Sequence, residues 1–156
     1  MKELSTRKNI RLGEYDYSRA GAYFVTICVK DGHELFGEIV GTTAPGRPAV
    51  ELTPLGICID ETIQVANKDK VTIDTYVIMP NHIHMIVVLG TDDRGRSSLQ
   101  QVVRNIKSYV TKWAGFSFWQ PRFHDRIIRD EDEYHRIRKY IDENPTRWQE
   151  DEYYTK

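Results

Sequence analysis

Two strand-like segments follow one another almost without a break, and this spacing constrains the fold more than any other feature of the chain. Residues 71–80 (VTIDTYVIMP) end on a proline, and residues 82–90 (HIHMIVVLG) begin after Asn81. Both segments are rich in β-branched residues, which favour strands, and Pro80 cannot continue the hydrogen-bond ladder. A connection this short joins antiparallel strands. The sequence therefore predicts an antiparallel pair with a tight turn at the proline and the asparagine.

His82 and His84 stand at the start of the second of these strands. Because side chains alternate between the two faces of a strand, both imidazoles point the same way. Both faces of the strand also carry apolar residues: Ile83, Met85, Val87 and Leu89 on one, Ile86 and Val88 on the other. Two interpretations stay open: hydrogen-bonded histidines near the end of a sheet, or a metal site, since imidazole suits Zn, Mn, Fe and Cu.

The rest of the chain alternates strand-like and helix-like segments. Further strands are predicted at residues 22–30, 35–40, 49–52 and 126–129, and helices at residues 54–67, 98–114 and 131–145. This order predicts an α+β fold, an antiparallel sheet of four to five strands with helices packed on it, in a ferredoxin-like (RRM-like) arrangement. We expect a single domain over residues 1–156, with a C-terminal helical extension from about residue 131.

Composition agrees with one globular domain, since 40% of the residues are hydrophobic and 29% are charged. No segment is long and apolar enough to span a bilayer, and the N-terminus lacks a signal-peptide core, so a cytoplasmic location is expected. Cys28 and Cys58 lie in apolar segments without CxxC spacing. They are predicted to be buried free thiols.

The charges are unevenly distributed, although the net charge of −1 argues against a generic nucleic-acid binder. Between residues 94 and 112 all the charged residues are basic: Arg94, Arg96, Arg104, Lys107 and Lys112. A second basic group follows, made of Arg122, Arg126 and Arg129, and a third lies near the start, made of Arg7, Lys8 and Arg11. A molecule with one basic face is compatible with a phosphate-rich partner.

Aromatic residues adjoin these cations. Tyr109 lies between the apolar stripe and the basic face of the helix predicted at residues 98–114. It is either an amphipathic residue with a buried ring, or a nucleophile whose phenol needs cationic or metal help because its ordinary pKa is near 10. Trp119 and Phe123 alternate with Arg122 and Arg126, a pattern that fits either base stacking or a small apolar cluster.

Several of these segments together resemble one known family. Residues 76–89 (YVIMPNHIHMIVVL) resemble the histidine–hydrophobic–histidine strand of the HUH endonucleases, and residues 106–113 (IKSYVTKW) resemble their single-tyrosine helix. Residues 7–29 and 118–145 are similar to REP-associated tyrosine transposases, relatives of the single-tyrosine insertion-sequence transposases. The resemblance covers nearly the whole chain.

The resemblance implies a ferredoxin-like palm domain that binds hairpin-forming single-stranded DNA. The protein would be associated with the nucleoid when it is bound to DNA. His82 and His84 would hold Mg²⁺ or Mn²⁺, and Tyr109 would attack the scissile phosphate to form a 5′-phosphotyrosine and free a 3′-hydroxyl. The basic residues expected to contact DNA are Arg104, Lys107, Lys112, Arg122 and Arg126. By the resemblance, insertion-sequence relatives form homodimers in which the tyrosine helix serves the partner's histidines, whereas REP-associated members can act alone, so a homodimer and a monomer both stay open.

The chain departs from the family pattern at one position. Insertion-sequence relatives carry a polar ligand one helical turn after the tyrosine, where this chain has Trp113. Asn105, one turn earlier, or an acidic residue elsewhere could replace it. Two other functions therefore stay open, a domesticated or inactive binder of hairpin DNA or RNA and, less favoured, a histidine-pair phosphodiesterase acting on small nucleotides.

Overall fold

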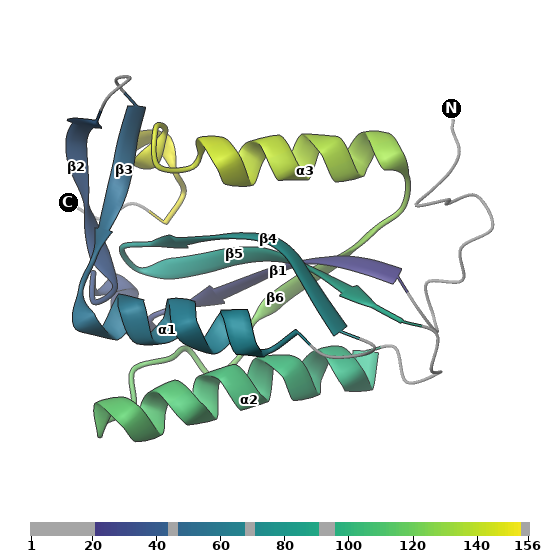
Figure 1. Cartoon of the computed structure of the whole chain (residues 1–156), viewed down its shortest axis with the longest axis horizontal. Helices are drawn as coiled ribbons and strands as arrows, with labels where there is room; N and C mark the ends of the chain where they lie inside the picture. The colour runs from purple at the N-terminus through teal and green to yellow at the C-terminus, as the bar shows by residue number, and fades with distance from the viewer. Residues whose placement is uncertain (1–20, 44–46, 68–70, 91–95, 154–156) are drawn as a thin grey trace.

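The computed structural model describes residues 21–43, 47–67, 71–90 and 96–153 (Figure 1). The N-terminal basic group, Arg94, and most of the loop before the second long helix lie outside the described residues.

A four-stranded antiparallel sheet with the order β4-β5-β1-β6 forms the centre of the molecule. Its strands are β1 (Gly21–Cys28), β4 (Val71–Met79), β5 (His82–Leu89) and β6 (His124–Ile128). Helix α1 (Pro54–Val65) links β1 to β4, and helix α2 (Arg96–Ala114) links β5 to β6. This is the split β-α-β topology of the ferredoxin-like fold, and the predicted α+β architecture is confirmed.

The strands β2 (Gly37–Thr43) and β3 (Arg47–Leu52) pair with each other in a separate two-stranded sheet. Within the described residues the central sheet therefore has four strands, and the predicted pairing of residues 35–40 with residues 49–52 occurs outside it. The chain turns between β1 and β2 at Asp31 and Gly32, whose φ angles of 62° and 72° lie in the left-handed region. β2 does not pair with β1, because β5 and β6 occupy both edges of that strand.

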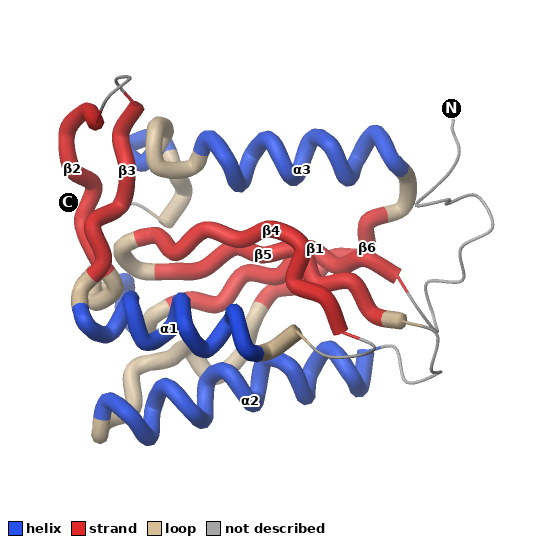
Figure 2. Tube along the Cα trace, viewed as in Figure 1, coloured by secondary structure: helices blue, strands red, loops and turns tan. Residues whose placement is uncertain are grey.

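The two faces of the central sheet are covered by different helices (Figures 1 and 2). Helices α1 and α2 cover the face that carries Ile83, Met85 and Val87, where the main core lies. Helix α3 (Glu131–Glu143) covers the other face and packs there through Ile137 and Ile141. A short 3-10 helix, η2 (Trp148–Glu150), follows it. Since strand side chains alternate, His82 and His84 belong to the α3 face.

The helix starts follow their sequence signals. Thr53 caps α1, and its Oγ1 accepts a hydrogen bond from the Gly56 N–H at 3.1 Å. Asp130 caps α3 and accepts from the Glu133 N–H at 2.8 Å, with three acids in the first turn to complement the helix dipole.

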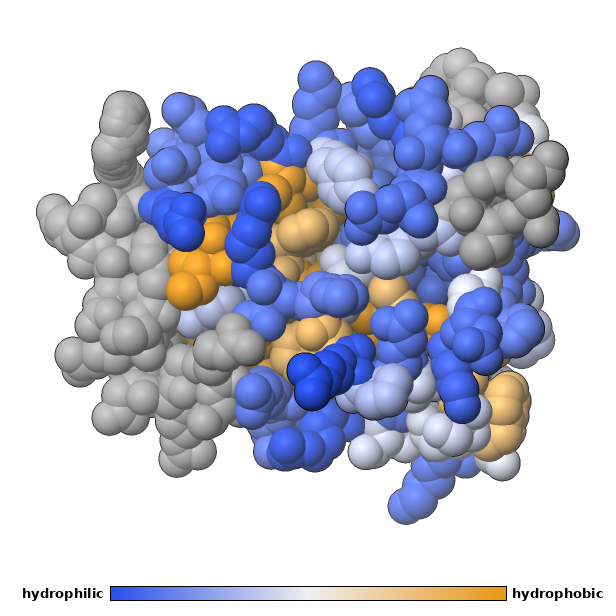
Figure 3. All heavy atoms as spheres, turned by 180° about the vertical axis from the view of Figure 1, so that it is seen from behind, coloured by the Kyte–Doolittle hydropathy of each residue, from blue (hydrophilic) through white to orange (hydrophobic). Residues whose placement is uncertain are grey.

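Cys28 and Cys58 are buried free thiols, as expected. None of the helices in the described ranges is both long and apolar enough to cross a membrane. The surface seen from behind is mostly hydrophilic, with apolar side chains visible between the polar ones (Figure 3).

Candidate functional site

The turn between β4 and β5 places the two histidines. Backbone hydrogen bonds hold this turn, because the Phe36 N–H donates to Pro80 O at 3.0 Å and the Val29 N–H donates to Asn81 O at 3.0 Å. His82 is 0% exposed and His84 is 2% exposed, and their ring centroids lie 4.5 Å apart. The prediction that both imidazoles point to one face is confirmed, and that face is buried at this end.

Hydrogen bonds to Nδ1 orient both rings. The Nδ1 of His82 lies 2.8 Å from Asn81 Oδ1. The Asn81 amide nitrogen donates to Gly32 O and Tyr153 O, which fixes Oδ1 as the acceptor facing the ring. His82 therefore carries its proton on Nδ1 and presents a bare lone pair at Nε2. The Nδ1 of His84 lies 2.9 Å from Thr26 Oγ1. Outer-shell contacts of this kind orient metal-binding histidines.

The two Nε2 atoms are the unusual feature of the site. Both are buried, and neither has a hydrogen-bond partner among the described residues. A buried polar atom without a partner costs free energy, so such atoms are rare in native proteins. Two of them on adjacent rings indicate that the site is built to receive a ligand.

Burial also keeps both imidazoles neutral. It lowers the pKa of His82 to about 3, and the nearby Asn144 side chain opposes this only partly. It lowers the pKa of His84 well below its ordinary value, and the neighbouring His82 lowers that pKa further. Neutral imidazole is the form that binds a metal ion, so no proton has to leave before binding at pH 7.

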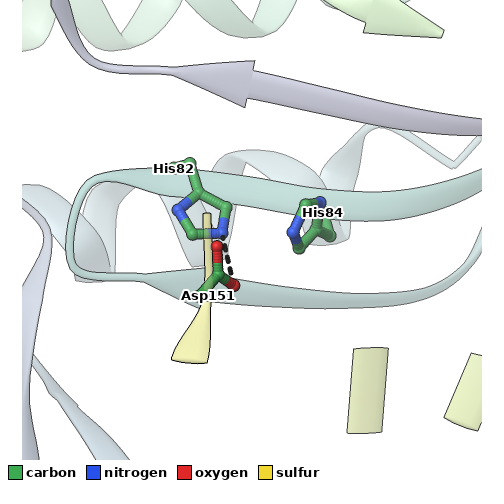
Figure 4. Close-up of side chains that lie close together, drawn as sticks. All are labelled: His82, His84 and Asp151. Carbon is green, nitrogen blue, oxygen red and sulfur yellow. Dashed lines mark ion pairs between the residues drawn. The ribbon is translucent and has the colours of Figure 1, made fainter. Parts of the chain in front are cut away.

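Asp151 completes a three-residue cluster with the histidines (Figure 4). Its Oδ2 lies 3.8 Å from His82 Nε2, and one ligand atom from each of the three residues lies within 4.8 Å of the others. The Oδ1 of Asp151 accepts a hydrogen bond from the Tyr153 N–H at 2.8 Å, and burial raises the pKa of this carboxyl. The cluster thus offers two nitrogens and one oxygen.

Helix α3 adds Tyr140 and Asn144 on its sheet-facing side. They stand three residues after Ile137 and Ile141 respectively, so all four share one face of the helix. The Tyr140 ring centroid is 5.3 Å from that of His84, and 41% of this residue is exposed. Asn144 is 2% exposed, and its Oδ1 has no hydrogen-bond partner within the described ranges. A hydroxyl and a free amide oxygen therefore accompany the histidines.

The C-terminal segment lies over the histidines. The Tyr153 ring is 4.5 Å from that of His82 and 5.9 Å from that of His84. Beside Tyr153 is an open cavity of about 560 Å³, hereafter the site cavity, lined by Phe24, Thr26, His124, Asp125, Arg126, Glu152 and Tyr153. It provides space for a substrate next to Thr26, the hydrogen-bond partner of His84.

Tyr109 is not beside the histidines of its own chain. It lies on α2 and is 58% exposed. Helix α2 packs on the sheet face opposite His82 and His84, so the sheet separates the tyrosine from them. Asn105, the replacement ligand suggested by the sequence, belongs to the same helix and lies on the same side of the sheet as Tyr109. On the histidine face lies α3, which carries Tyr134 and Tyr140, and of these two the Tyr140 ring packs against His84.

The predicted DNA-contacting cations divide between two places. Arg126 lines the site cavity and pairs with Glu133 at 3.2 Å. Arg104, Lys107 and Arg122 line a second cavity on the α2 side. Lys112, in the last turn of α2, lines neither.

Sequence reasoning missed four residues of the site: Tyr140, Asn144, Asp151 and Tyr153. One signal was present, because Tyr140 and Asn144, the C-cap residue of α3, stand four residues apart and continue the apolar face formed by Ile137 and Ile141. Asp151 and Tyr153 follow the last long helix and carry no comparable signal.

Sequence comparison finds relatives of this chain. No family model matches it. An uncharacterized protein of Haemophilus influenzae is 33% identical over an alignment that covers 95% of this chain and 93% of that protein. A REP-associated tyrosine transposase of Escherichia coli is 34% identical over 86 residues, which are 54% of this chain and 50% of the transposase.

Structural comparison also finds a REP-associated tyrosine transposase. The fold is similar to that of a REP-associated tyrosine transposase solved bound to a REP hairpin, with a TM-score of 0.64 and 26% sequence identity. The match covers 86% of this chain and 72% of that protein.

Proposed function

Because the chain belongs to the family of REP-associated tyrosine transposases, we propose that it cuts and rejoins single-stranded DNA at hairpin-forming sites, using a divalent cation and a tyrosine nucleophile. Family membership makes the chain transposase-like. A hairpin substrate is proposed because the solved relative is bound to a REP hairpin. The observation that carries the chemistry is the pair of buried Nε2 atoms without hydrogen-bond partners, on His82 and His84, beside the Tyr140 ring.

The residues at the site fit a divalent cation. His82 Nε2, His84 Nε2 and Asn144 Oδ1 are all buried without a hydrogen-bond partner in the described part of the chain, and the Asp151 carboxylate is close to the histidines. Two imidazole nitrogens with amide and carboxylate oxygens form a mixed ligand set that suits Mn²⁺, and Mg²⁺ with added waters. When bound there, such an ion would withdraw charge from the oxygens of the scissile phosphate.

We assign the nucleophile to Tyr140. Its ring lies against His84 while part of the residue stays exposed, so a phosphate placed at the histidines is within reach of its hydroxyl. Burial raises the pKa of Tyr140, so the hydroxyl is protonated in the free protein and depends on positive charge at the site for activation.

The reaction is a balanced exchange of phosphodiester bonds. Tyr140 Oη bonds to phosphorus and loses its proton, the bond from phosphorus to the 3′ oxygen breaks, and the 3′ oxygen leaves and takes up one proton. The products are a 5′-phosphotyrosine and a free 3′-hydroxyl. Attack of a 3′-hydroxyl on the phosphotyrosine reforms a DNA strand and releases Tyr140, so the two steps need no external energy source.

The test uses hairpin-forming single-stranded DNA from the flanks of this gene. Wild type incubated with the DNA and Mn²⁺ or Mg²⁺ is expected to form a covalent adduct that survives denaturing electrophoresis. Tyr140→Phe should abolish the adduct, because it removes only the attacking oxygen. Tyr109→Phe, the matched control, should retain it.

Other outcomes decide between the alternatives. An adduct that persists in Tyr140→Phe and disappears in Tyr109→Phe would show that α2 of a second copy supplies the nucleophile. Binding of the hairpin without an adduct, under either metal ion, would identify the chain as a non-catalytic hairpin binder.

A further inference from the structure

A second cavity, also about 560 Å³ in volume, lies between α2 and residues 121–125, and we call it the basic cavity. The helix lines it with Gln100, Arg104, Lys107 and Ser108, whose spacing places them on one face. It lies on the α2 side of the sheet, whereas the histidines lie on the α3 side. It is therefore separate from the site cavity, and its volume suits a small ligand or one nucleotide.

Positive charge dominates the basic cavity. Arg104, Lys107 and Arg122 line it, and among its described lining residues Asp125 supplies the one carboxylate. Lys107 is half-buried, and its Nζ donates to Gln120 O at 2.8 Å. Burial lowers the pKa of Lys107, which indicates that the ammonium is poorly solvated and would gain from an anion. An anionic ligand with several oxygens, such as a phosphodiester, matches this arrangement.

The wall opposite α2 is held in place and includes an aromatic ring. The Lys30 N–H donates to Phe118 O at 2.8 Å, and the Gln120 N–H donates to Cys28 O at 2.9 Å. Trp119 Nε1 donates to Lys107 O at 3.3 Å, which ties this segment to α2. Phe123 packs against the main core and also lines the cavity, so its ring can support a stacked base.

The two cavities meet at β6. Asp125 of this strand lines both of them, and β6 is an edge strand of the central sheet. On the site-cavity side, His124 pairs with Thr26, which contacts His84. A DNA strand can therefore pass from the histidine site over the edge strand into the basic cavity without crossing the sheet.

We propose that the basic cavity binds one nucleotide of the single-stranded DNA that lies in the histidine site. The base stacks on Phe123, and the flanking phosphates contact Arg104, Lys107 and Arg122. This inference rests on the proposed function, since it extends the path of the same DNA strand. It assigns the basic cavity to strand positioning, apart from the chemistry at Tyr140.

The test measures binding without cleavage, in EDTA, so that it does not depend on the metal ion or on Tyr140. The probe is a fluorescein-labelled oligo(dT) of about 12 nucleotides, a length within the range of known single-strand sites. Arg104→Gln/Arg122→Gln is compared with Arg136→Gln/Lys139→Gln, which removes the same charge from exposed positions of α3. The affinity for the probe is measured as a function of salt concentration.

The cavity variant is expected to lower the salt slope of binding by about 1.4, at about 0.7 per lost phosphate contact, and to weaken binding about tenfold or more. The α3 variant should keep a slope near that of wild type. Equal losses in both variants would overturn the proposal, because they would indicate a general electrostatic effect.

A photo-crosslink locates the contact directly. Oligo(dT) containing 4-thiothymidine is expected to label the peptide that contains Phe123 in wild type, and Phe123→Leu should lose that label while retaining an apolar side chain against the core. Labels found only elsewhere would refute the basic cavity as the binding place. Failure of adduct formation with intact labelling at Phe123 would reject the cleavage mechanism and leave this inference standing.

Discussion

Thr26 Oγ1 on β1 lies 2.9 Å from His84 Nδ1 on β5, and the two residues face each other in the strand pairing. The hydroxyl fixes the orientation of a buried ring whose other nitrogen has no hydrogen-bond partner within the described ranges. Thr26, a strand residue paired with His84, therefore helps to hold the candidate metal site in position.

Thr26→Val should weaken metal binding without removing a ligand. Valine keeps the shape of threonine and deletes the hydroxyl, so His84 loses its orienting partner. The affinity for Mn²⁺, measured by calorimetric titration, is expected to fall by about 10- to 100-fold, as for other second-layer partners of metal ligands. Thr26→Ser should retain most of the affinity, and equal Mn²⁺ affinity in all three proteins would contradict the role of the hydroxyl.

Asn144→Leu should reduce the stabilisation of the folded protein by Mn²⁺. The substitution removes the amide oxygen that has no hydrogen-bond partner in the described part of the chain. Mn²⁺ at 100 times its Kd should stabilise wild type by about 2.7 kcal/mol, and Asn144→Leu should show a smaller gain at the same concentration. Thermal unfolding of each protein, with Mn²⁺ and with EDTA, measures the stabilisation that the metal ion gives to wild type and to Asn144→Leu. An unchanged Mn²⁺ effect would exclude Asn144 as a ligand.

Without metal, acid should destabilise the protein through the histidines. The pKa of His82 is lowered to about 3 in the folded state, so between about pH 6.5 and pH 3 the unfolded chain binds a proton that the folded chain does not. The stabilisation is complete above about pH 6.5 and is lost as pH falls, by at most about 1.4 kcal/mol per pH unit for each such histidine.

Urea unfolding in EDTA across that pH range tests this dependence. The double variant His82→Gln/His84→Gln should show a flatter dependence of the unfolding free energy on pH, because glutamine does not titrate. The comparison cancels the contribution of carboxylates common to both proteins. Parallel profiles would show that the histidines titrate normally in the folded state.

Ile137→Ala should loosen α3 from the sheet. Ile137 is 5% exposed and belongs to the small cluster that joins this helix to β1, β5 and β6. The free energy of unfolding should fall by about 2–4 kcal/mol from the lost burial and the cavity left behind. Arg136→Ala, on the exposed side of the same helix, should change it by no more than about 0.5 kcal/mol. Urea unfolding of both variants measures the difference, and equal effects would argue against this packing.

Local sequence patterns predicted much of the architecture. Alternation along residues 82–90 placed His82 and His84 on one face, and Pro80 ended the preceding strand. The helices predicted from residues 54 and 131 begin at those residues in the structure, where Thr53 and Asp130 are the N-caps. These features depend on neighbours in the chain, so residue type and spacing are enough to predict them.

Only the tertiary structure decided which residues meet at the site. Helical periodicity shows which side of a helix is apolar, but not which face of a sheet that side covers. The sequence therefore pointed to Tyr109 alone, and Tyr140 became a candidate only because α3 is the helix on the histidine face. Asp151 and Tyr153 reach the histidines through chain folding after α3, with Asn81 donating to Tyr153 O at 2.7 Å. Asn81 and Tyr153 are 72 residues apart in the sequence, and whether they meet depends on how the whole chain packs. A local sequence pattern does not predict such a contact.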